Sequence, residues 1–267
     1  MITSLQNPRV KQAVRLRKRS ERDEAGLLLI EGYRELKRAL DNHVRPEALF
    51  YCTELFQGTN EPTLLKQAEA AGAELIPCSA AVFHKMAYRD RPEGLLALAP
   101  QVHIPLESLQ VLEHPLLLLA EHIEKPGNLG TMLRSADAAG VHAVIVCDRC
   151  TDINNPNVVR ASIGALFTLP VVDASSQAVK QWLQERDIQV VAATPHTDRD
   201  YTEIDYAKGT AILVGAEQVG LSDFWMNEAD GQVRIPMLGQ CDSLNVAAAA
   251  TILLYEAVRQ RRLAATA

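Results

Sequence analysis

Short apolar runs alternate with amphipathic segments over the first hundred residues. The continuous apolar runs predict strands, and the segments with apolar side chains at helical spacing predict helices. The expected strands lie at residues 27–30, 48–52, 74–77 and 94–99, and the expected helices at 10–19, 32–40, 63–71 and 80–86. This alternation predicts one small α/β domain at residues 1–100.

The alternation restarts more strongly after a proline-flanked segment, residues 100–105, which lacks clear periodicity. We therefore predict a linker at 101–112 and a second domain at 113–267. Its expected strands are 116–120, 143–147, 169–172, 189–193, 211–214 and 233–235, and its expected helices are 128–139, 157–166, 178–186, 221–228 and 244–262. Apolar strands of this kind indicate an α/β fold with a mostly parallel sheet and helices on both faces.

Strand-to-helix turns are the places to search for a site, because ligands of parallel sheets bind beyond the carboxyl ends of the strands. The first such turn, residues 121–137, contains Asn128, a residue type that favours helix N-caps, and Gly130 in the first helical turn. Gly130 permits close approach of a ligand or another backbone. Arg134 lies off the apolar stripe of the predicted helix, so it points either into a cleft or toward Asp137 on the surface.

Two later turns add further signals. The second, residues 215–222, follows an apolar strand, and its two glycines allow backbone amides to line a pocket. Ser222 is expected to cap the next helix, but the turn matches neither the dinucleotide-binding fingerprint nor the P-loop. The third turn, residues 235–247, contains Ser243, expected to open the last helix, and Asn245, a poor helix former expected inside its first turn.

In this order, the three turns resemble the three motifs of the TrmH-like (SpoU) RNA methyltransferases of the SPOUT superfamily. The matching residues are Glu124-Lys125-Pro126-Gly127-Asn128-Leu129-Gly130 with Arg134, Gly215-Ala216-Glu217 with Gly220-Leu221-Ser222, and Ile235-Pro236-Met237 with Ser243-Leu244-Asn245-Val246. The resemblance covers about residues 115–262, and the start of the chain resembles the small L30e-like substrate-binding domain of these enzymes. It implies a SPOUT domain with a C-terminal trefoil knot, preceded by an L30e-like α/β domain.

The resemblance also implies an activity. The family transfers a methyl group from S-adenosylmethionine to a ribose 2′-hydroxyl of structured rRNA or tRNA, and we expect rRNA here. It implies a homodimer formed through the knot domain and no metal. Carried over to this chain, the cofactor contacts fall at Gly215, Ile235 and Leu244, with Leu213, Met237 and Gly239 as neighbours.

The catalytic residues that the resemblance implies are Arg134, Asn128, Glu217, Ser243 and Asn245. In the family, an arginine matching Arg134 is proposed to act on the 2′-hydroxyl. Because a guanidinium stays protonated, the alternative is that Arg134 clamps the adjacent phosphate and stabilises developing alkoxide charge. Asn128 would orient the ribose or Arg134, and Glu217 would position Arg134 or a loop backbone. Ser243 and Asn245 would shape the nucleophile site by hydrogen bonding.

The net charge of −6 conceals a basic N-terminal region. Lys and Arg outnumber Asp and Glu in residues 1–45, whereas acidic residues prevail in the rest. This region is either a solvated basic helix or, with RNA as the implied partner, a surface that contacts phosphates without selecting the nucleotide. The expected RNA contacts are Arg9, Lys11, Arg15 and Lys18, with Arg17, Arg19 and Arg22 in the same stretch, and Tyr33, Tyr88, Arg89 and Arg91 are candidates for contacts with splayed bases.

Composition narrows the setting. The chain is 48% hydrophobic and 22% charged, as is ordinary for a globular protein, and no apolar run is long enough to span a bilayer. The start lacks the basic-then-apolar pattern of a secretory signal. Five scattered cysteines, an odd number, favour a reducing, cytoplasmic setting.

Other motifs and function classes are weaker. The spacing of Cys147 and Cys150 is thioredoxin-like, but no second pair completes a zinc set, so we interpret them as one buried and one loop cysteine. The resemblance implies that Asn157, Arg160 and Ser162 face the active site. An NAD-type oxidoreductase is opposed by the absent fingerprint. A non-catalytic RNA-binding or ribosome-assembly factor is opposed by the intact catalytic set.

Overall fold

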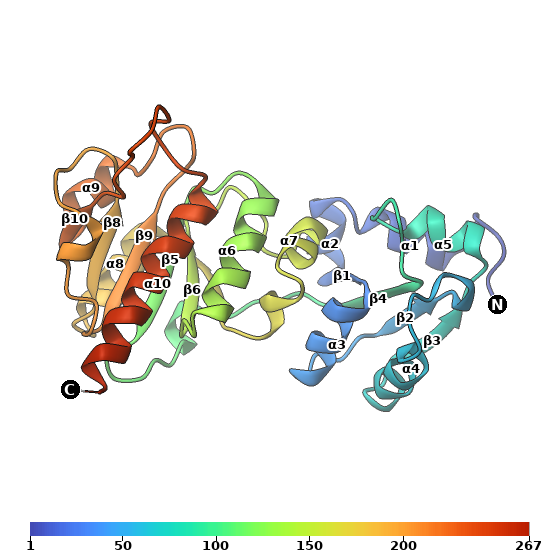
Figure 1. Cartoon of the computed structure of the whole chain (residues 1–267). Coiled ribbons are helices and arrows are strands. Elements are labelled where there is room, and N and C mark those ends of the chain that lie inside the picture. Colours follow the sequence, from blue (N-terminus) through green and yellow to red (C-terminus); the bar gives the residue numbers. More distant parts are fainter. Residues whose placement is uncertain (267) are drawn as a thin grey trace. The chain divides into compact units, whose positions relative to one another are not determined.

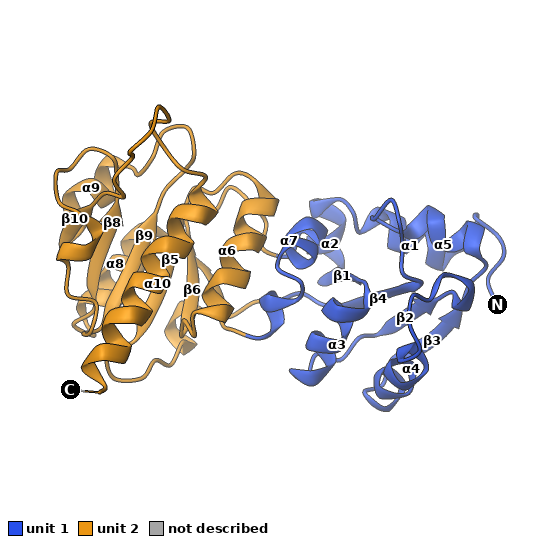
Figure 2. Ribbon diagram, in the orientation of Figure 1, with its two compact units in different colours: residues 1–102, 154–168 blue, residues 103–153, 169–267 orange. Residues whose placement is uncertain are grey.

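The computed structural model describes residues 1–266, which divide into two compact units (Figures 1 and 2). Unit 1 comprises residues 1–102 and 154–168, and unit 2 comprises residues 103–153 and the chain from Leu169 onward. The segment 154–168 therefore packs with the N-terminal part, although the sequence analysis placed it in the C-terminal domain. None of the described helices combines the length and apolar character that crossing a bilayer requires.

Unit 1 is built on a sheet with the strand order β1-β4-β2-β3. In it, β4 runs antiparallel to β1 and β2, and β2 runs parallel to β3. The strands are β1 (Leu27–Glu31), β2 (Ala48–Tyr51), β3 (Glu74–Pro77) and β4 (Leu95–Pro100). The helices are α1 (Pro8–Arg15), α2 (Arg19–Ala25), α3 (Tyr33–Asp41), α4 (Glu61–Ala70), α5 (Ala80–Met86) and α7 (Pro156–Ala161), with short 3-10 helices η1 (Thr53–Leu55) and η3 (Ala165–Phe167).

The predicted first helix, residues 10–19, is in fact two helices with a break after Arg15. Buried Arg22 explains the break, because its guanidinium donates to the carbonyl oxygens of Leu16 and Arg17, each at 2.9 Å. These carbonyls lie at the end of α1, where helical partners run out. Val10, on the inner face of α1, is buried in the core of unit 1 as its spacing predicted.

Unit 2 is built on a sheet with the strand order β10-β8-β9-β5-β6-β7, in which every adjacent pair is parallel. The strands are β5 (Leu116–Glu121), β6 (Ala143–Cys147), β7 (Val171–Ala174), β8 (Gln189–Ala193), β9 (Thr210–Val214) and β10 (Gly231–Val233). The helices are α6 (Pro126–Ala138), α8 (Ser176–Gln184), α9 (Asp223–Glu228) and α10 (Val246–Ala264), with η2 (Leu106–Ser108) and η4 (Tyr201–Glu203).

This order confirms the predicted parallel sheet and places its topological switch between β5 and β9. From β5 the chain moves on to β6, yet β9 returns much later to the other edge of β5. Figure 1 shows α6 and α10 side by side on one face of the sheet and α8 on the other. The predicted inner stripe of α10 is buried, at Val246, Ala250, Leu253 and Ala257. Ligand sites of such sheets lie at the switch, so the turns after β5 and β9 are its natural walls.

Two further predicted elements differ from the structure. The helix expected at 157–166 ends at Ala161, because Ile163 and Gly164 adopt the left-handed conformation, with φ of 52° and 79°. A side chain at Gly164 would also meet the backbone of Glu35, since its Cβ would lie 3.0 Å from the Glu35 Cα. The strand expected at 233–235 lies earlier, at β10, and residues beyond Val233 form an irregular segment leading to α10.

Candidate functional site

The first turn leads from β5 into α6, and its helix begins earlier than predicted. Lys125 is the N-cap residue and Pro126 occupies the first helical position, where its fixed φ suits a helix and its missing N–H is not needed. Asn128 therefore lies inside the first turn of α6, and the prediction that it caps the helix is wrong. Its side chain is free to serve another purpose.

That purpose is a contact with the third turn. The Asn128 Oδ1 accepts a hydrogen bond of 3.2 Å from the Nδ2 of Asn245. Asn245 is itself the N-cap of α10, because its Oδ1 accepts from the backbone N–H of Ala247 at 3.0 Å. The predictions that Asn245 lies inside the last helix and that Ser243 opens it are therefore wrong. One asparagine orders α10 and holds α6 with the same side chain.

The Nδ2 of Asn128 is buried and has no hydrogen-bond partner among residues 1–266. Leaving a buried donor unpaired costs about 1–3 kcal/mol, and native structures avoid it unless a ligand or water completes the bond. A second contact fixes the same pair of helices, because the hydroxyls of Ser135 and Thr251 lie 2.7 Å apart. The unpaired amide is thus held in a rigid position.

The second turn is closed on itself by its two glycines. A Cβ at Gly215 would lie 2.5 Å from the backbone carbon of Gly220, so no side chain fits there. Gly220 has φ of 73°, which favours glycine, and Ala216 and Gly220 form an isolated bridge. The result is a narrow loop whose surface consists largely of backbone.

Two interactions attach this loop to the first turn. Glu121, buried at the end of β5, accepts from the backbone N–H of Ser222 at 2.9 Å and from its hydroxyl at 2.6 Å. Lys125 forms an ion pair with Glu217, and this hydrogen bond raises the pKa of Lys125 above its usual value. Ser222 caps α9, as predicted, by accepting from the N–H of Trp225.

Glu121 and Lys125 are functional candidates that the sequence analysis missed. A carboxylate that ends an otherwise apolar strand is the signal by which Glu121 is recognisable. The contact of Glu217 is with Lys125, whereas Arg134 or a loop backbone was expected. Arg134 is exposed on α6 and forms no hydrogen bond or ion pair within residues 1–266, so its guanidinium is available to a ligand.

The predicted cofactor residues occupy the same end of the sheet. Leu213 is fully buried near the end of β9 and supports Gly215 two residues later. Ile235 and Met237 are partly buried, whereas Gly239 and Ser243 are exposed. Three exposed apolar side chains belong to these turns: Val219, Leu238 and Leu244, at 81%, 98% and 39% exposure.

The basic residues near the N-terminus have unequal surroundings. Lys11, Arg15 and Lys18 are exposed, while Arg9 forms an ion pair of 2.9 Å with Glu74. Arg17 and Arg22 were expected among the phosphate contacts, but Arg17 donates to the carbonyl oxygens of Lys85 and Ala87, and Arg22 is buried. These two guanidiniums therefore stabilise the fold by donating hydrogen bonds to backbone carbonyl oxygens.

The polar segment expected beside the active site belongs to unit 1. Asn157 donates to the hydroxyl of Tyr88 at 2.9 Å, and buried Ser162 donates to the carbonyl of Val159 at 3.0 Å. Arg160 is exposed and forms no hydrogen bond or ion pair through its side chain in the described part of the chain.

Comparisons with known proteins agree with this geometry. The model of the SpoU rRNA Methylase family matches residues 115–255, and that of the MRM3-like substrate binding domain matches residues 7–97. A 23S rRNA (uridine(2479)-2′-O)-methyltransferase of Streptomyces viridochromogenes is 34% identical over 91% of this chain and 86% of that protein. The 23S rRNA (guanosine(2553)-2′-O)-methyltransferase RlmP of Bacillus subtilis is 31% identical, over 95% and 97%.

Solved structures show the same likeness over nearly the whole chain. The AdoMet-bound rRNA methyltransferase from Sinorhizobium meliloti has a TM-score of 0.89 and 32% identity, covering 97% of both chains. An RNA 2′-O ribose methyltransferase has a TM-score of 0.85 and 42% identity, covering 98% of this chain and 99% of the other. The sequence, the fold and these matches agree, and the chain belongs to the SpoU rRNA methylase family.

Proposed function

We propose that this protein is an S-adenosylmethionine-dependent methyltransferase that modifies a ribose 2′-hydroxyl in structured 23S rRNA. Relatives covering most of the chain are named as 23S rRNA 2′-O-methyltransferases. The observation that carries the proposal is the contact between Asn128 and Asn245, which joins the first and third turns and leaves one buried amide nitrogen unpaired. A non-catalytic RNA-binding factor has no chemical use for this arrangement.

The second and third turns fit the cofactor. A structural neighbour is solved with AdoMet bound, and S-adenosylmethionine is accordingly the cofactor we assign. The backbone surface of the loop at Gly215 suits hydrogen bonds to a small polar ligand, and the exposed Leu244 supplies apolar contact. The cofactor residues we propose are Leu213, Gly215, Ile235, Met237, Gly239 and Leu244.

Arg134 is the group we assign to the reacting oxygen. When bound, S-adenosylmethionine supplies an activated methyl group, so the protein must orient the hydroxyl and manage its proton. Correct orientation alone can contribute about 7–11 kcal/mol at best. A guanidinium stays protonated, and an unpaired one on α6 is suited to hold a phosphate and stabilise developing alkoxide charge.

The remaining catalytic candidates position the first turn and the ribose. Asn128 offers its unpaired amide to a ribose or phosphate oxygen, and Asn245 fixes the orientation of that amide. Glu217 holds Lys125 and thereby the entrance to α6. Ser243, exposed just before α10, is free to hydrogen-bond the substrate.

RNA is also the partner that the basic N-terminal region suits. Lys11, Arg15 and Lys18 are exposed and without side-chain partners among the described residues, so phosphates can replace their counterions. Arg9 contributes if it leaves Glu74. We further propose domains at residues 1–100 and 113–267 joined by a linker at 101–112, with the exception that residues 154–168 pack with the first unit.

The family pattern supports three further assignments. We assign a homodimer formed through the C-terminal domain, and a trefoil knot involving the irregular segment between β10 and α10. All five cysteines are free thiols, which supports a cytoplasmic setting.

The decisive experiment offers radiolabelled S-adenosylmethionine and separate pools of unmodified rRNA and tRNA to the full-length protein. Label is expected in 23S rRNA, and mapping of 2′-O-methyl groups is expected to find a single ribose. Calorimetry is expected to detect binding of S-adenosylmethionine and none of NAD. Cofactor binding without methyl transfer to either pool would favour the non-catalytic alternative.

A further inference from the structure

A large cavity lies within unit 1 and is lined by none of the proposed catalytic residues. Its volume is about 870 Å³, within the range of about 300–1,000 Å³ typical of ligand pockets. It is bordered by the start of α3, the turn before α4, the segment before β4, and α7. Every lining residue belongs to the same compact unit.

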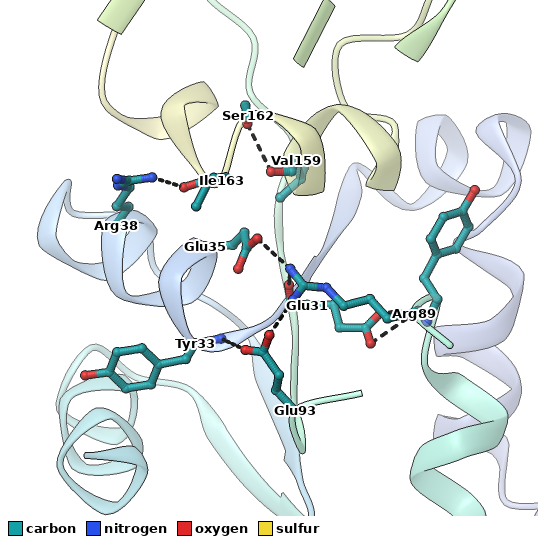
Figure 3. A network of polar contacts seen from close by, with 10 residues as sticks. Glu31, Tyr33, Glu35, Arg38, Arg89, Glu93, Val159, Ser162 and Ile163 are labelled. Carbon is teal, nitrogen blue, oxygen red and sulfur yellow. Dashed lines mark hydrogen bonds and ion pairs between the residues drawn. The ribbon is translucent and has the colours of Figure 1, made fainter. Parts of the chain in front are cut away.

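The floor of the cavity is a rigid network around Arg89 (Figure 3). Its guanidinium donates to Glu35 at 2.5 Å and to Glu93 at 2.6 Å, and also to the backbone carbonyl of Glu31 at 3.1 Å. Gly32 completes the floor, because a Cβ there would lie 2.7 Å from the Arg89 Nη2. Arg89 is therefore occupied by the protein and unavailable for stacking on a base, contrary to the sequence prediction.

The carboxylates of the cavity are largely satisfied. Glu35 and Glu93 are paired with Arg89, and Glu93 also accepts from the backbone N–H of Tyr33 at 3.0 Å. Glu61 accepts from the backbone N–H groups of Gln57 and Gly58 at 3.0 and 2.7 Å. Glu35 and Glu93 therefore do not compete for the cations that line the rim, whereas the buried Oε2 of Glu61 has no hydrogen-bond partner among the described residues.

The rim carries three arginines whose side chains are exposed and unpaired among residues 1–266: Arg34, Arg91 and Arg160. Asp90 is the one lining carboxylate without a partner in that range, so positive charge prevails at the rim. Tyr33 lies between rim and floor, and Figure 3 shows its ring extending away from the Arg89 network.

We propose that this cavity binds an unpaired nucleotide of the RNA substrate, with the base against Tyr33 and the flanking phosphates on Arg34, Arg91 and Arg160. The inference rests on the proposed function and names a second contact with the same RNA. Structured RNA is recognised largely through splayed bases that stack on aromatic or guanidinium planes. Anions without a base would not use the tyrosine, and a continuous duplex cannot place a base in a cavity.

The test compares two fluorescent RNA probes: a hairpin with an unpaired loop, and the same stem closed as a blunt duplex. The full-length variants are Tyr33→Ala, Tyr33→Phe and the double variant Arg34→Ala with Arg91→Ala. Arg45→Ala is the matched control, because Arg45 is an exposed, unpaired arginine of unit 1 outside the cavity lining. Circular dichroism melting of each variant establishes that it is folded.

Wild type is expected to bind the hairpin at least tenfold more tightly than the duplex. Tyr33→Ala is expected to weaken hairpin binding by about tenfold, whereas Tyr33→Phe retains it. The double arginine variant is expected to weaken it similarly and to reduce the salt dependence by about 1.4 in log–log slope. The proposal would be overturned if Tyr33→Ala and the double arginine variant bound the hairpin as tightly as Arg45→Ala does. It would also be overturned if these variants lost equal affinity for the hairpin and the duplex.

Methyl transfer to rRNA, measured in parallel, separates this inference from the proposed function. If both hold, the cavity variants raise KM and leave kcat and the affinity for S-adenosylmethionine unchanged. If wild type transfers no methyl group but selective hairpin binding is lost in the cavity variants, the nucleotide site stands and the proposed function fails.

Discussion

The unpaired amide nitrogen of Asn128 is the most informative single atom of the proposed active site. The Oδ1 of the same side chain accepts a hydrogen bond from Asn245 and so fixes the amide between α6 and α10. The nitrogen cannot rotate away without loss of that hydrogen bond. Arg134, on the same helix, is the opposite case, because it is exposed and has no hydrogen bond or ion pair in the described part of the chain. Asn128 is therefore fixed before the substrate binds, whereas the Arg134 side chain can adjust its position when the substrate binds.

Arg134→Ala is predicted to lower kcat for methyl transfer by about a hundredfold, because a donor that stabilises developing charge is lost. The affinity for S-adenosylmethionine and the melting temperature are expected to stay near wild type, since the exposed Arg134 side chain forms no hydrogen bond or ion pair among residues 1–266. Arg134→Lys keeps the positive charge but loses the paired N–H donors of the guanidinium, so intermediate activity is expected. Arg262→Ala, an exposed arginine of α10, is the control, and a wild-type rate in Arg134→Ala would remove this residue from the mechanism.

Cys241 is exposed in the third turn and can serve as a probe of the proposed cofactor site. In native protein, Ellman's reagent is predicted to modify only Cys241 and Cys150, because Cys52, Cys78 and Cys147 are buried. Burial also raises the pKa of Cys78 to about 11 and that of Cys147 well above its usual value. In a Cys150→Ser background, S-adenosylmethionine is expected to slow the modification of Cys241. Cys150 in a Cys241→Ser background should be indifferent to the cofactor, and equal protection of both would contradict the assigned position.

Much of the residue-level site could be predicted from the sequence, but not the roles within it. Asn128, Glu217 and Asn245 were identified as candidates, and all three contribute to contacts between the turns. Lys125 was not among the expected partners of Glu217, which were Arg134 and a loop backbone, because the sequence does not show which cation the fold brings to this carboxylate. Glu121 was missed, since only the pairing of β5 with β9 brings Ser222 to it.

At the scale of elements, helices α1 and α10 carry the features that bear on partners and on stability. The basic side chains near α1 divide into exposed ones and those bonded to backbone carbonyls. Helix α10 packs against α6 and β9, and near its end Glu256 binds Arg259 through two hydrogen bonds of 2.7 Å.

Replacing Lys11, Arg15 and Lys18 with glutamine is predicted to weaken RNA binding and to lower its salt dependence by about 2 in log–log slope. The reason is that each lost cation leaves one phosphate with its counterion. Glutamine at Arg17 is the informative contrast, because Arg17 serves backbone carbonyls and its loss is expected to lower stability instead. An unchanged slope in the triple variant, measured by titration at several salt concentrations, would exclude this surface.

Glu256→Gln is predicted to lower the melting temperature at pH 7 and to matter less in acid. The hydrogen bonds from Arg259 hold the pKa of Glu256 below its usual value, so the folded state favours the carboxylate. Its stabilising effect is present above about pH 4.5 and is lost as the pH falls through the lowered pKa. Melting curves of both proteins from pH 7 to pH 3 should converge, and a gap that widens in acid would contradict the assignment.

The positions of strands followed from the sequence more closely than the starts of helices did. Apolar runs define β6 and β8 at the residues expected, because burial on both faces leaves a continuous apolar signal. Helix starts depend on a local competition among caps. Helix α6 begins at Pro126 and not at Asn128, and α10 is capped by Asn245 and not by Ser243.

At the scale of the whole molecule, connectivity departs furthest from what a linear pattern can indicate. Periodicity cannot reveal that β9 returns to pair with β5, nor that residues 154–168 leave the second unit to join the first. That segment contributes Val158, Val159 and Leu166, all buried, and it packs against β1 and α3 through α7 and η3. The chain therefore passes between the units at three places.

A truncated chain ending at residue 102 is predicted to be destabilised by about 3 kcal/mol or more relative to one that retains the segment. The reason is the loss of several buried side chains, each contributing about 1.5–3 kcal/mol. Fusing residues 154–168 to residue 102 through a flexible linker should restore the urea midpoint. Equal midpoints for the two polypeptides would mean that the segment does not belong to the folding unit.

The detour of residues 154–168 also orders events during synthesis. Protein domains commonly fold as they leave the ribosome, the N-terminal one first. Here the first unit stays incomplete until residue 168 has emerged, by which time β5 and β6 of its neighbour are already outside the exit tunnel. The first unit of this protein thus completes its folding only after part of the second has been synthesised, and a pause in decoding between residues 102 and 154 would prolong the time that the first unit spends without its last segment.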